Sequence, residues 1–444
     1  MVFVKLNDSL VANLNNGRNT HVFNVTLIIM AILLHQSQVL FGINLSFSDI
    51  FCFVLILIMM INKEASLPVA PMIFFLIVSI IVLLSAVFFI PSIVMYNPSA
   101  ISIVNDYLKL VAIFIYFITG YNLVKKRLVI KTIKWFSVSG ILIGALGGVF
   151  TLFHIHFFTN LLYFDSTRFR GLMIDPNYFS VLQISAFVYF SRSEMKMRYK
   201  VAAFFLFIFS VLISGSKTGI LTFIGYLAFR LCEYIFKKRK KMHVIGGQLI
   251  VVGCLLVCIP VVLTSLDFIF QYLSKVVPSF SRIQLLFTDF SGAFSENGSG
   301  RTVTWEVALR LIQLSPVIGI GIGTYSNVAN ELFYENHISH NTFLQLSSEW
   351  GLPLAFIFFL YVLTVLWKAT TSGGSNNTNS ILRDIIIILL LGSLAISLNN
   401  ARILWLVLGA LVSSLERNYS VDNAGDKDVQ TILPIYQKEK EYDV

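Results

Sequence analysis

Long apolar runs recur along the chain and predict an all-α protein that crosses a membrane many times. About twelve such runs lie near 22–41, 45–61, 69–90, 101–123, 135–153, 178–190, 200–213, 218–236, 243–264, 353–367, 381–398 and 401–415. A helix that crosses the hydrocarbon core upright needs about 20 apolar residues. Several runs are shorter than this, so their boundaries are approximate. Helices satisfy their own backbone hydrogen bonds in lipid, which favours a polytopic helical bundle.

The composition agrees with this pattern. Of the 444 residues, 56% are hydrophobic, and only 13% are charged. Soluble domains carry about 25% charged residues, so a cytosolic enzyme with a polar surface is excluded. Disorder is excluded as well, because it requires low hydrophobicity.

The basic residues predict which side of the membrane each loop occupies. The net charge is +10, but runs such as 125–127 and 237–241 directly follow long apolar stretches. This is the pattern of cytoplasmic loops in membrane proteins rather than of a nucleic-acid surface. We therefore expect a multi-pass protein of the plasma membrane with both termini in the cytoplasm, and no nucleic-acid partner.

The same pattern divides the chain into five parts. Residues 1–21 form a cytoplasmic N-terminus, 22–264 hold spans one to nine, and 265–352 form a large extracytoplasmic loop. Residues 353–415 hold the last three spans, and 416–444 form a cytoplasmic tail. Within the loop, apolar residues at helical spacing predict an amphipathic helix with Trp305, Ala308, Leu309 and Ile312 on its apolar face.

The few basic residues outside the membrane lie in unusual local sequences. These are Arg168 to Asn177 (RFRGLMIDPN), Ser214 to Gly219 (SGSKTG), Gly298 to Thr302 (GSGRT), Pro316 to Gly323 (PVIGIGIG) and His337 to Gly351 (HISHNTFLQLSSEWG). Arginine grips phosphate oxygens with a planar fork. Histidine titrates near neutral pH and can take a proton from a hydroxyl. Together these groups suit a lipid diphosphate that is displaced by an alcohol.

Other interpretations of these segments are weaker. Gly215 to Thr218 resembles the end of a P-loop but lacks its required glycines. Gly319, Gly321 and Gly323 lack the third glycine of a dinucleotide loop, so we predict a tight turn. No metal-binding motif surrounds His337 and His340.

Five motifs in order resemble those of the O-antigen ligase/polymerase superfamily of bacterial envelope glycosyltransferases. The family patterns R-x-x-G-x-x-x-x-P-N, S-G-S-[RK]-[TG], G-R-x-x-x-W, P-x-x-G-x-G-x-G and H-N-x-x-L…E-x-G match residues 168–177, 214–218, 300–305, 316–323 and 340–351. The resemblance implies a GT-C-like membrane enzyme that needs no metal or other cofactor.

The resemblance also implies roles for single residues. His340 would accept the proton of the attacking sugar hydroxyl, while Arg168, Lys217 and Arg301 would hold the diphosphate. Further substrate contacts would come from Arg170, Asn177, Asn341 and Glu349. Three of these residues have alternative interpretations: Arg170 could reach lipid headgroups, and Asn341 and Glu349 could order the loop.

The expected reaction joins undecaprenyl-diphosphate-linked repeat units, donor and acceptor, into a capsule, exopolysaccharide or O-antigen. A chain-length regulator and a flippase are candidate partners. A ligase that passes a finished glycan to another acceptor remains an alternative, since the motifs do not separate the two activities. A second alternative is a flippase or exporter, for which the intramembrane residues Asp106, Lys109, Glu233 and Asp384 are candidates. Asp106 and Lys109 could instead simply pair, because they are three residues apart.

Overall fold

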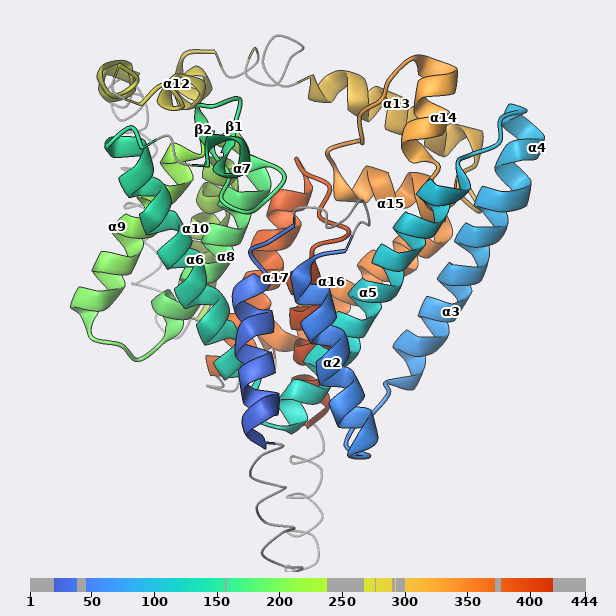
Figure 1. Ribbon diagram of the computed structural model, residues 1–444, viewed down its shortest axis with the longest axis horizontal. Coiled ribbons are helices and arrows are strands. Elements are labelled where there is room, and N and C mark those ends of the chain that lie inside the picture. Colours follow the sequence, from blue (N-terminus) through green and yellow to red (C-terminus); the bar gives the residue numbers. More distant parts are fainter. Residues whose placement is uncertain are drawn as a thin grey trace, which may run out of the picture.

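A computed structural model describes residues 20–37, 45–155, 158–237, 267–275, 277–289, 292, 300–371 and 377–417. The described residues are almost entirely helical, which confirms the all-α prediction (Figure 1). The helices of the bundle are α2 (Phe47–Ile61), α3 (Val69–Leu84), α4 (Ile90–Val94), α5 (Ala100–Lys125), α6 (Val129–Leu152), α8 (Pro176–Arg192), α9 (Met197–Ile213), α10 (Lys217–Lys237), α16 (Leu352–Thr371) and α17 (Asn377–Ser393). A helix at Thr20–Leu33 precedes them, and a helix at 402–417 follows them.

Among the described residues, five helical segments are long and apolar enough to cross a membrane. They are Val69–Val94, Ala100–Lys125, Val129–Leu152, Lys217–Ile235 and Leu352–Thr371. The first of these joins α3 to α4 through a π-helical turn, Ser85–Phe89. Thr20–Leu33 and Phe47–Ile61 are shorter apolar helices.

Eleven of the twelve predicted apolar runs coincide with helices, while run 243–264 lies outside the described residues. The total of twelve spans and the sidedness of the loops stay predictions. Two boundaries were wrong. Within the described residues, the run 22–41 is helical only to Leu33. The run 381–398 is helical only to Ser393, and residues 394–401 form a loop. The backbone of this loop is satisfied by the side chains of Asn341 and Thr342, so its apolar residues can be buried without continuing the helix.

The centre of the bundle is α8, which packs against α6, α9, α10 and α17. Gly140, Gly144 and Gly148 repeat every fourth residue along α6. A side chain at Gly144 would collide with Ser210 of α9. Small residues at this spacing allow membrane helices to approach closely.

A buried ion cluster ties α8, α10 and α17 together. The Asp384 carboxylate is fully buried and receives Arg192 at 2.7 Å, Arg383 at 2.8 Å and Arg230 at 3.1 Å. Arg192 and Arg383 also pair with Glu233, at 3.1 and 2.7 Å. Glu233 and Asp384, which were candidates for a transport pathway, are therefore neutralised within a cluster that holds three helices.

The opposite end of the bundle carries short helices and a small hairpin (Figure 1). The hairpin pairs β1 (Tyr163–Phe164) with β2 (Arg168–Phe169) in antiparallel register, just after α7 (Thr159–Leu162). The described parts of the predicted loop 265–352 form α12 (Phe280–Thr288), α13 (Arg301–Leu314), α14 (Tyr325–Phe333) and α15 (Thr342–Trp350).

The helix predicted around Trp305 exists as α13, but its buried face is rotated from the prediction. Ala308 and Ile312 are buried as predicted, but so are Thr304, Val307 and Leu311, whereas Leu309 is exposed. The α13 helix packs on α14 and also on α15, and the contact with α15 determines which face of α13 is buried.

Candidate functional site

A cavity of about 490 Å³ lies at the end of the bundle that carries the hairpin and the short helices. Five of the predicted site residues line it: Arg168, Asn177, Lys217, Arg301 and His340. They come, in that order, from β2, the start of α8, the start of α10, the start of α13 and the residue before the N-cap of α15. The structure therefore brings together residues that lie up to 172 positions apart in the sequence.

Four helices begin at the wall of this cavity. They are α8, α10, α13 and α15, and residues at or next to each N-terminus line the cavity. The N-terminus of a helix carries a partial positive charge and unpaired N–H groups. The backbone therefore reinforces the charge of the basic side chains and favours an anionic ligand.

Arg168 is held rigidly in the wall. Its Nε donates to the carbonyl of Ser214 at 3.0 Å, and one terminal nitrogen donates to Oδ1 of Asn177 at 3.2 Å. The residue is 6% exposed. Burial and the neighbouring Arg282 lower the pKa of Arg168 to about 10, so it stays charged at neutral pH.

Asn177 connects two of the motifs. The same Oδ1 also accepts from the hydroxyl of Ser216 at 2.9 Å, and Ser216 in turn accepts from the backbone N–H of Gly219 at 2.9 Å. Asp175 caps α8 by accepting from the N–H groups of Asn177 and Tyr178. Asn177 lines the cavity while fixing the starts of α8 and α10 relative to each other.

Arg301 and Lys217 lie on the opposite side of this junction. Arg301 is the first residue of α13, and its guanidinium donates to the hydroxyl of Thr218 at 2.9 Å. Both basic side chains are largely buried. Burial is the main cause that lowers the pKa of Arg301.

His340 faces these cations from the turn before α15. Its backbone is in the left-handed region (φ 48°), which is uncommon for a residue other than glycine. Burial is the main cause that lowers the pKa of His340 below 6.5, Arg301 adds to this, and Asp175 opposes it. The imidazole is therefore neutral at pH 7 and can accept a proton.

Asn341 has a clear structural task. Its Oδ1 accepts from the N–H groups of Phe343 and Leu344, and so caps α15. Its Nδ2 donates to the carbonyl of Leu394 at 3.1 Å. The side chain orders the turn that presents His340, in agreement with the loop-ordering interpretation.

Three predicted substrate-binding residues do not line the cavity: Asn341, Arg170 and Glu349. Arg170 donates to the carbonyls of Ile174 and Asn160, at 3.0 and 2.9 Å, and thus braces the loop before α8. Glu349 is buried, accepts a hydrogen bond from Gln345 and lines a smaller neighbouring cavity. Burial raises the pKa of Glu349 to about 8.

Sequence patterns did not single out two arginines that line the cavity. Arg282 projects from α12, and Arg402 forms a two-point ion pair with Asp49, at 3.0 and 2.8 Å. Arg282 lies in no motif, so only its isolated position on a short amphipathic helix could have suggested that it lines the cavity. His337 also lines the cavity, but its ring is mostly exposed and contacts Glu335 at 2.5 Å.

The glycine-rich segment between α13 and α14 packs against the C-terminal end of α15. Gly319, Gly321 and Gly323 all have positive φ, which confirms the predicted tight turn. The N–H groups of Ile320 and Gly321 donate to the carbonyls of Ser348 and Glu349, at 2.8 and 3.1 Å. The segment therefore fixes the C-terminal end of the helix whose N-terminus presents His340.

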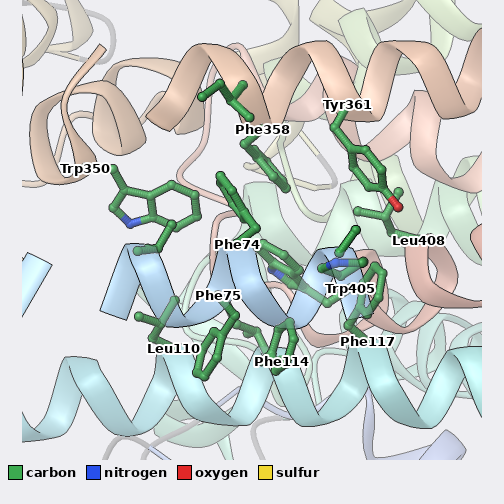
Figure 2. Close-up of a pocket in the computed structure, with 15 residues that line it drawn as sticks. Phe74, Phe75, Leu110, Phe114, Phe117, Trp350, Phe358, Tyr361, Trp405 and Leu408 are labelled. Atoms are coloured by element: carbon green, nitrogen blue, oxygen red, sulfur yellow. The ribbon is translucent and has the colours of Figure 1, made fainter. Parts of the chain in front are cut away.

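Two further cavities lie beside the cationic one. The nearer has a volume of about 140 Å³ and shares Lys109, Ile338, Ser397 and Asn400 with it. The farther one, about 220 Å³, is lined by apolar and aromatic side chains of α3, α5, α16 and helix 402–417 (Figure 2). Leu110, Ile113 and Trp350 line both of these cavities, so the small cavity lies between the aromatic cavity and the cationic one.

No group of three or more His, Cys, Asp or Glu side chains within the described ranges is arranged to hold a metal ion. The charged groups that face the cavity are mainly cationic side chains of the protein itself.

Comparison with protein families supports the resemblance. Residues 202–359 match the O-antigen ligase family. The matched stretch contains Lys217, Arg301, His340, Asn341 and Glu349, whereas Arg168, Arg170 and Asn177 precede it. The predicted resemblance to the O-antigen ligase/polymerase superfamily is thereby confirmed.

Together, the O-antigen ligase match and the apolar helices indicate a membrane enzyme of the O-antigen ligase/polymerase type. A comparison with curated proteins found no match.

Proposed function

We propose that the protein polymerises undecaprenyl-diphosphate-linked oligosaccharide repeat units into a surface polysaccharide, at the outer face of the plasma membrane. One observation carries the proposal: several buried or half-buried cations and a histidine with a lowered pKa face a single cavity. A diphosphate leaving group and a sugar hydroxyl together need this combination of charge and base.

In the proposed reaction, a hydroxyl of the acceptor sugar attacks the anomeric carbon of the donor. A new glycosidic bond forms as the bond between the anomeric carbon and the diphosphate oxygen breaks. The hydroxyl proton passes to His340, and undecaprenyl diphosphate leaves with the bonding electron pair. His340 then returns its proton to solvent or to the released diphosphate.

Arg168, Lys217 and Arg301 stabilise the negative charge that grows on the diphosphate. They lie in a buried wall, where charges interact more strongly than in water. The start of α13, which has no side-chain cap, adds its partial positive charge. We propose that these groups do the work that a divalent cation does in other enzymes, so that the reaction needs no metal.

The aromatic cavity in Figure 2 supports a lipid-borne substrate. Phe74, Phe75, Phe114 and Phe117 contribute to a lining with almost no polar surface, and the cavity opens beside the polar ones. Such a surface accommodates hydrocarbon at little cost, whereas it would leave polar groups without hydrogen-bond partners.

Ligation is the second candidate function. It is favoured by the description of the matched family as an O-antigen ligase. Both reactions use the same donor chemistry and differ in the acceptor, so one assay can distinguish them.

The test uses purified protein and synthetic undecaprenyl-diphosphate repeat units, with and without a chelator. The proposal expects a ladder of products that persists in the chelator, and its loss in His340→Ala but not in the matched His337→Ala variant. Transfer only to a different acceptor would favour ligation. The absence of any glycosidic product would reject both functions, and loss of the ladder in chelator would reject metal independence.

A further inference from the structure

The small cavity beside the cationic one differs from it in charge. Its carboxylate at Asp106 is paired with Lys109 at 2.7 Å, and Glu349 is buried with a raised pKa. The amides of Gln345, Asn399 and Asn400 supply most of the remaining polar lining. The cavity is thus polar but close to neutral, which suits a ligand with hydroxyl groups better than a phosphate.

One wall of this cavity is an indole. Trp350 is 3% exposed and is fixed by edge contacts with Phe74 and Phe358, with ring centroids 6.3 and 5.7 Å away. Figure 2 shows the Trp350 ring at one end of the aromatic cavity, and the same residue also lines the small cavity. A sugar ring presents C–H groups on its faces and hydroxyls at its rim. A flat aromatic wall with amides and carboxyls around it is complementary to that shape.

The cavity is also linked to the turn that holds His340. Gln345 accepts hydrogen bonds from the N–H and the hydroxyl of Ser339, at 3.3 and 3.1 Å, and donates to Glu349. Ser339 immediately precedes His340. Lys109, Ile338, Ser397 and Asn400 line both cavities, so the small cavity is directly adjacent to the cationic one.

We infer that this cavity is a subsite for one sugar residue of the acceptor glycan, held by Asn399, Asn400 and Glu349 against the Trp350 ring. The inference rests on the proposed glycosyl transfer. It places the ring of the acceptor sugar in the small cavity, so that the attacking hydroxyl enters the adjacent cationic cavity, which His340 lines and where the diphosphate leaves.

The binding test does not depend on turnover. Saturation-transfer NMR is recorded on the purified protein with methyl glycosides of glucose, galactose, N-acetylglucosamine and N-acetylgalactosamine. We expect transfer to at least one glycoside, unchanged by added inorganic diphosphate. Asn399→Ala removes one amide from the cavity and should weaken binding about tenfold. Asn330→Ala, an exposed change on α14, is the matched control.

Three results would overturn the subsite. The first is saturation transfer to none of the glycosides, which would mean that the cavity holds only water. The second is displacement of the glycoside by diphosphate, which would mean that the glycoside binds among the cations. The third is unchanged glycoside binding in Asn399→Ala. Trp350→Phe, which keeps an aromatic ring, should retain more binding than Trp350→Leu, and equal loss in both would contradict stacking.

A kinetic test separates this inference from the proposed function. Asn399→Ala should raise KM for the acceptor about tenfold and leave KM for the donor unchanged. Failure of the wild-type protein to form any polymer would reject the proposed function, while the NMR result would still decide the subsite. Normal acceptor KM in Asn399→Ala would reject the subsite and leave the function standing.

Discussion

The guanidinium of Arg301 donates a hydrogen bond of 2.9 Å to the hydroxyl of Thr218, although 83 residues separate them in the sequence. This contact joins the start of α13 to the start of α10. It holds the Arg301 fork beside Lys217 in the cavity wall. Two short motifs that are weak by themselves therefore form one anion-binding surface.

Replacing Arg301 with lysine tests the importance of that fork. Lysine keeps the charge but loses the planar arrangement of donors and the bond to Thr218. We expect kcat for chain growth to fall by about 100-fold, the scale for loss of one donor to a developing charge. Arg310→Lys, on the exposed side of the same helix, is the matched control. Full activity of Arg301→Lys would mean that Arg301 contributes only general charge.

His340→Ala should abolish chain growth while the protein still folds and inserts into the membrane. The imidazole lies at the cavity and is neutral at pH 7, so its loss removes the proton acceptor. His337→Ala should remain active, because the His337 ring points largely to solvent. Polymer length is measured on membranes that contain equal amounts of each protein. Polymer of normal length from His340→Ala would contradict the assignment.

The lowered pKa of His340 predicts the pH dependence. A general base acts only when unprotonated, so the rate should rise with pH as His340 loses its proton and then level off. Because burial and Arg301 lower this pKa, the midpoint of the rise should lie below 6.5. A pH–rate profile measures it. A midpoint at or above 6.5 would contradict the environment described for this ring.

Much of the site could be predicted because its charges lie in separate, recognisable motifs. Arg168, Lys217, Arg301 and His340 each stood out as polar groups in an apolar chain, and topology alone placed them at one membrane surface. Arg282 could not be found in this way, because its approach to the cavity depends on how α12 folds back over the bundle. The sequence also could not show that Glu349 lies outside the cationic cavity, because the position of its side chain depends on which face of α15 points inward.

The fold shows the same limit. Hydropathy identified the helices, yet it extended the run 381–398 past Ser393. A buried loop and a membrane span are equally apolar in sequence. They differ in how their backbone groups are satisfied, and here the hydroxyl of Thr342 donates to the carbonyl of Ile396 and accepts from the N–H of Leu398. A contact 54 residues away in the chain is outside the reach of a local pattern.

Gly319→Ala should destabilise the protein more than Gly300→Ala does. Both glycines have similar positive φ, 69° and 63°, so both variants lose about 1–2 kcal/mol from the backbone conformation. A Cβ at Gly319 would also lie 2.4 Å from the carbonyl oxygen of Glu349, whereas nothing lies within 4 Å of a Cβ at Gly300. The additional clash would shift the end of α15. Thermal unfolding in detergent compares the two variants, and equal losses would contradict the close approach.

Glu349→Gln should remove a pH-dependent loss of stability. Burial raises the pKa of Glu349 from its usual 4.5 to about 8, so the folded protein retains a proton that the unfolded chain releases. Stability from this group is fully present below pH 4.5 and is lost as the pH rises toward 8. Glutamine cannot ionise, so at pH 8 the free energy of unfolding of the variant should exceed that of the wild type by an amount on the order of a few kcal/mol. The variant should therefore unfold at a higher temperature than the wild type at this pH. The difference should shrink at pH 5.

Glu306→Gln, an exposed change on α13, should follow the wild-type curve of stability against pH. Parallel curves for Glu349→Gln and the wild type would show that the carboxyl is already ionised in the folded protein, and would weaken the argument that the small cavity is nearly neutral.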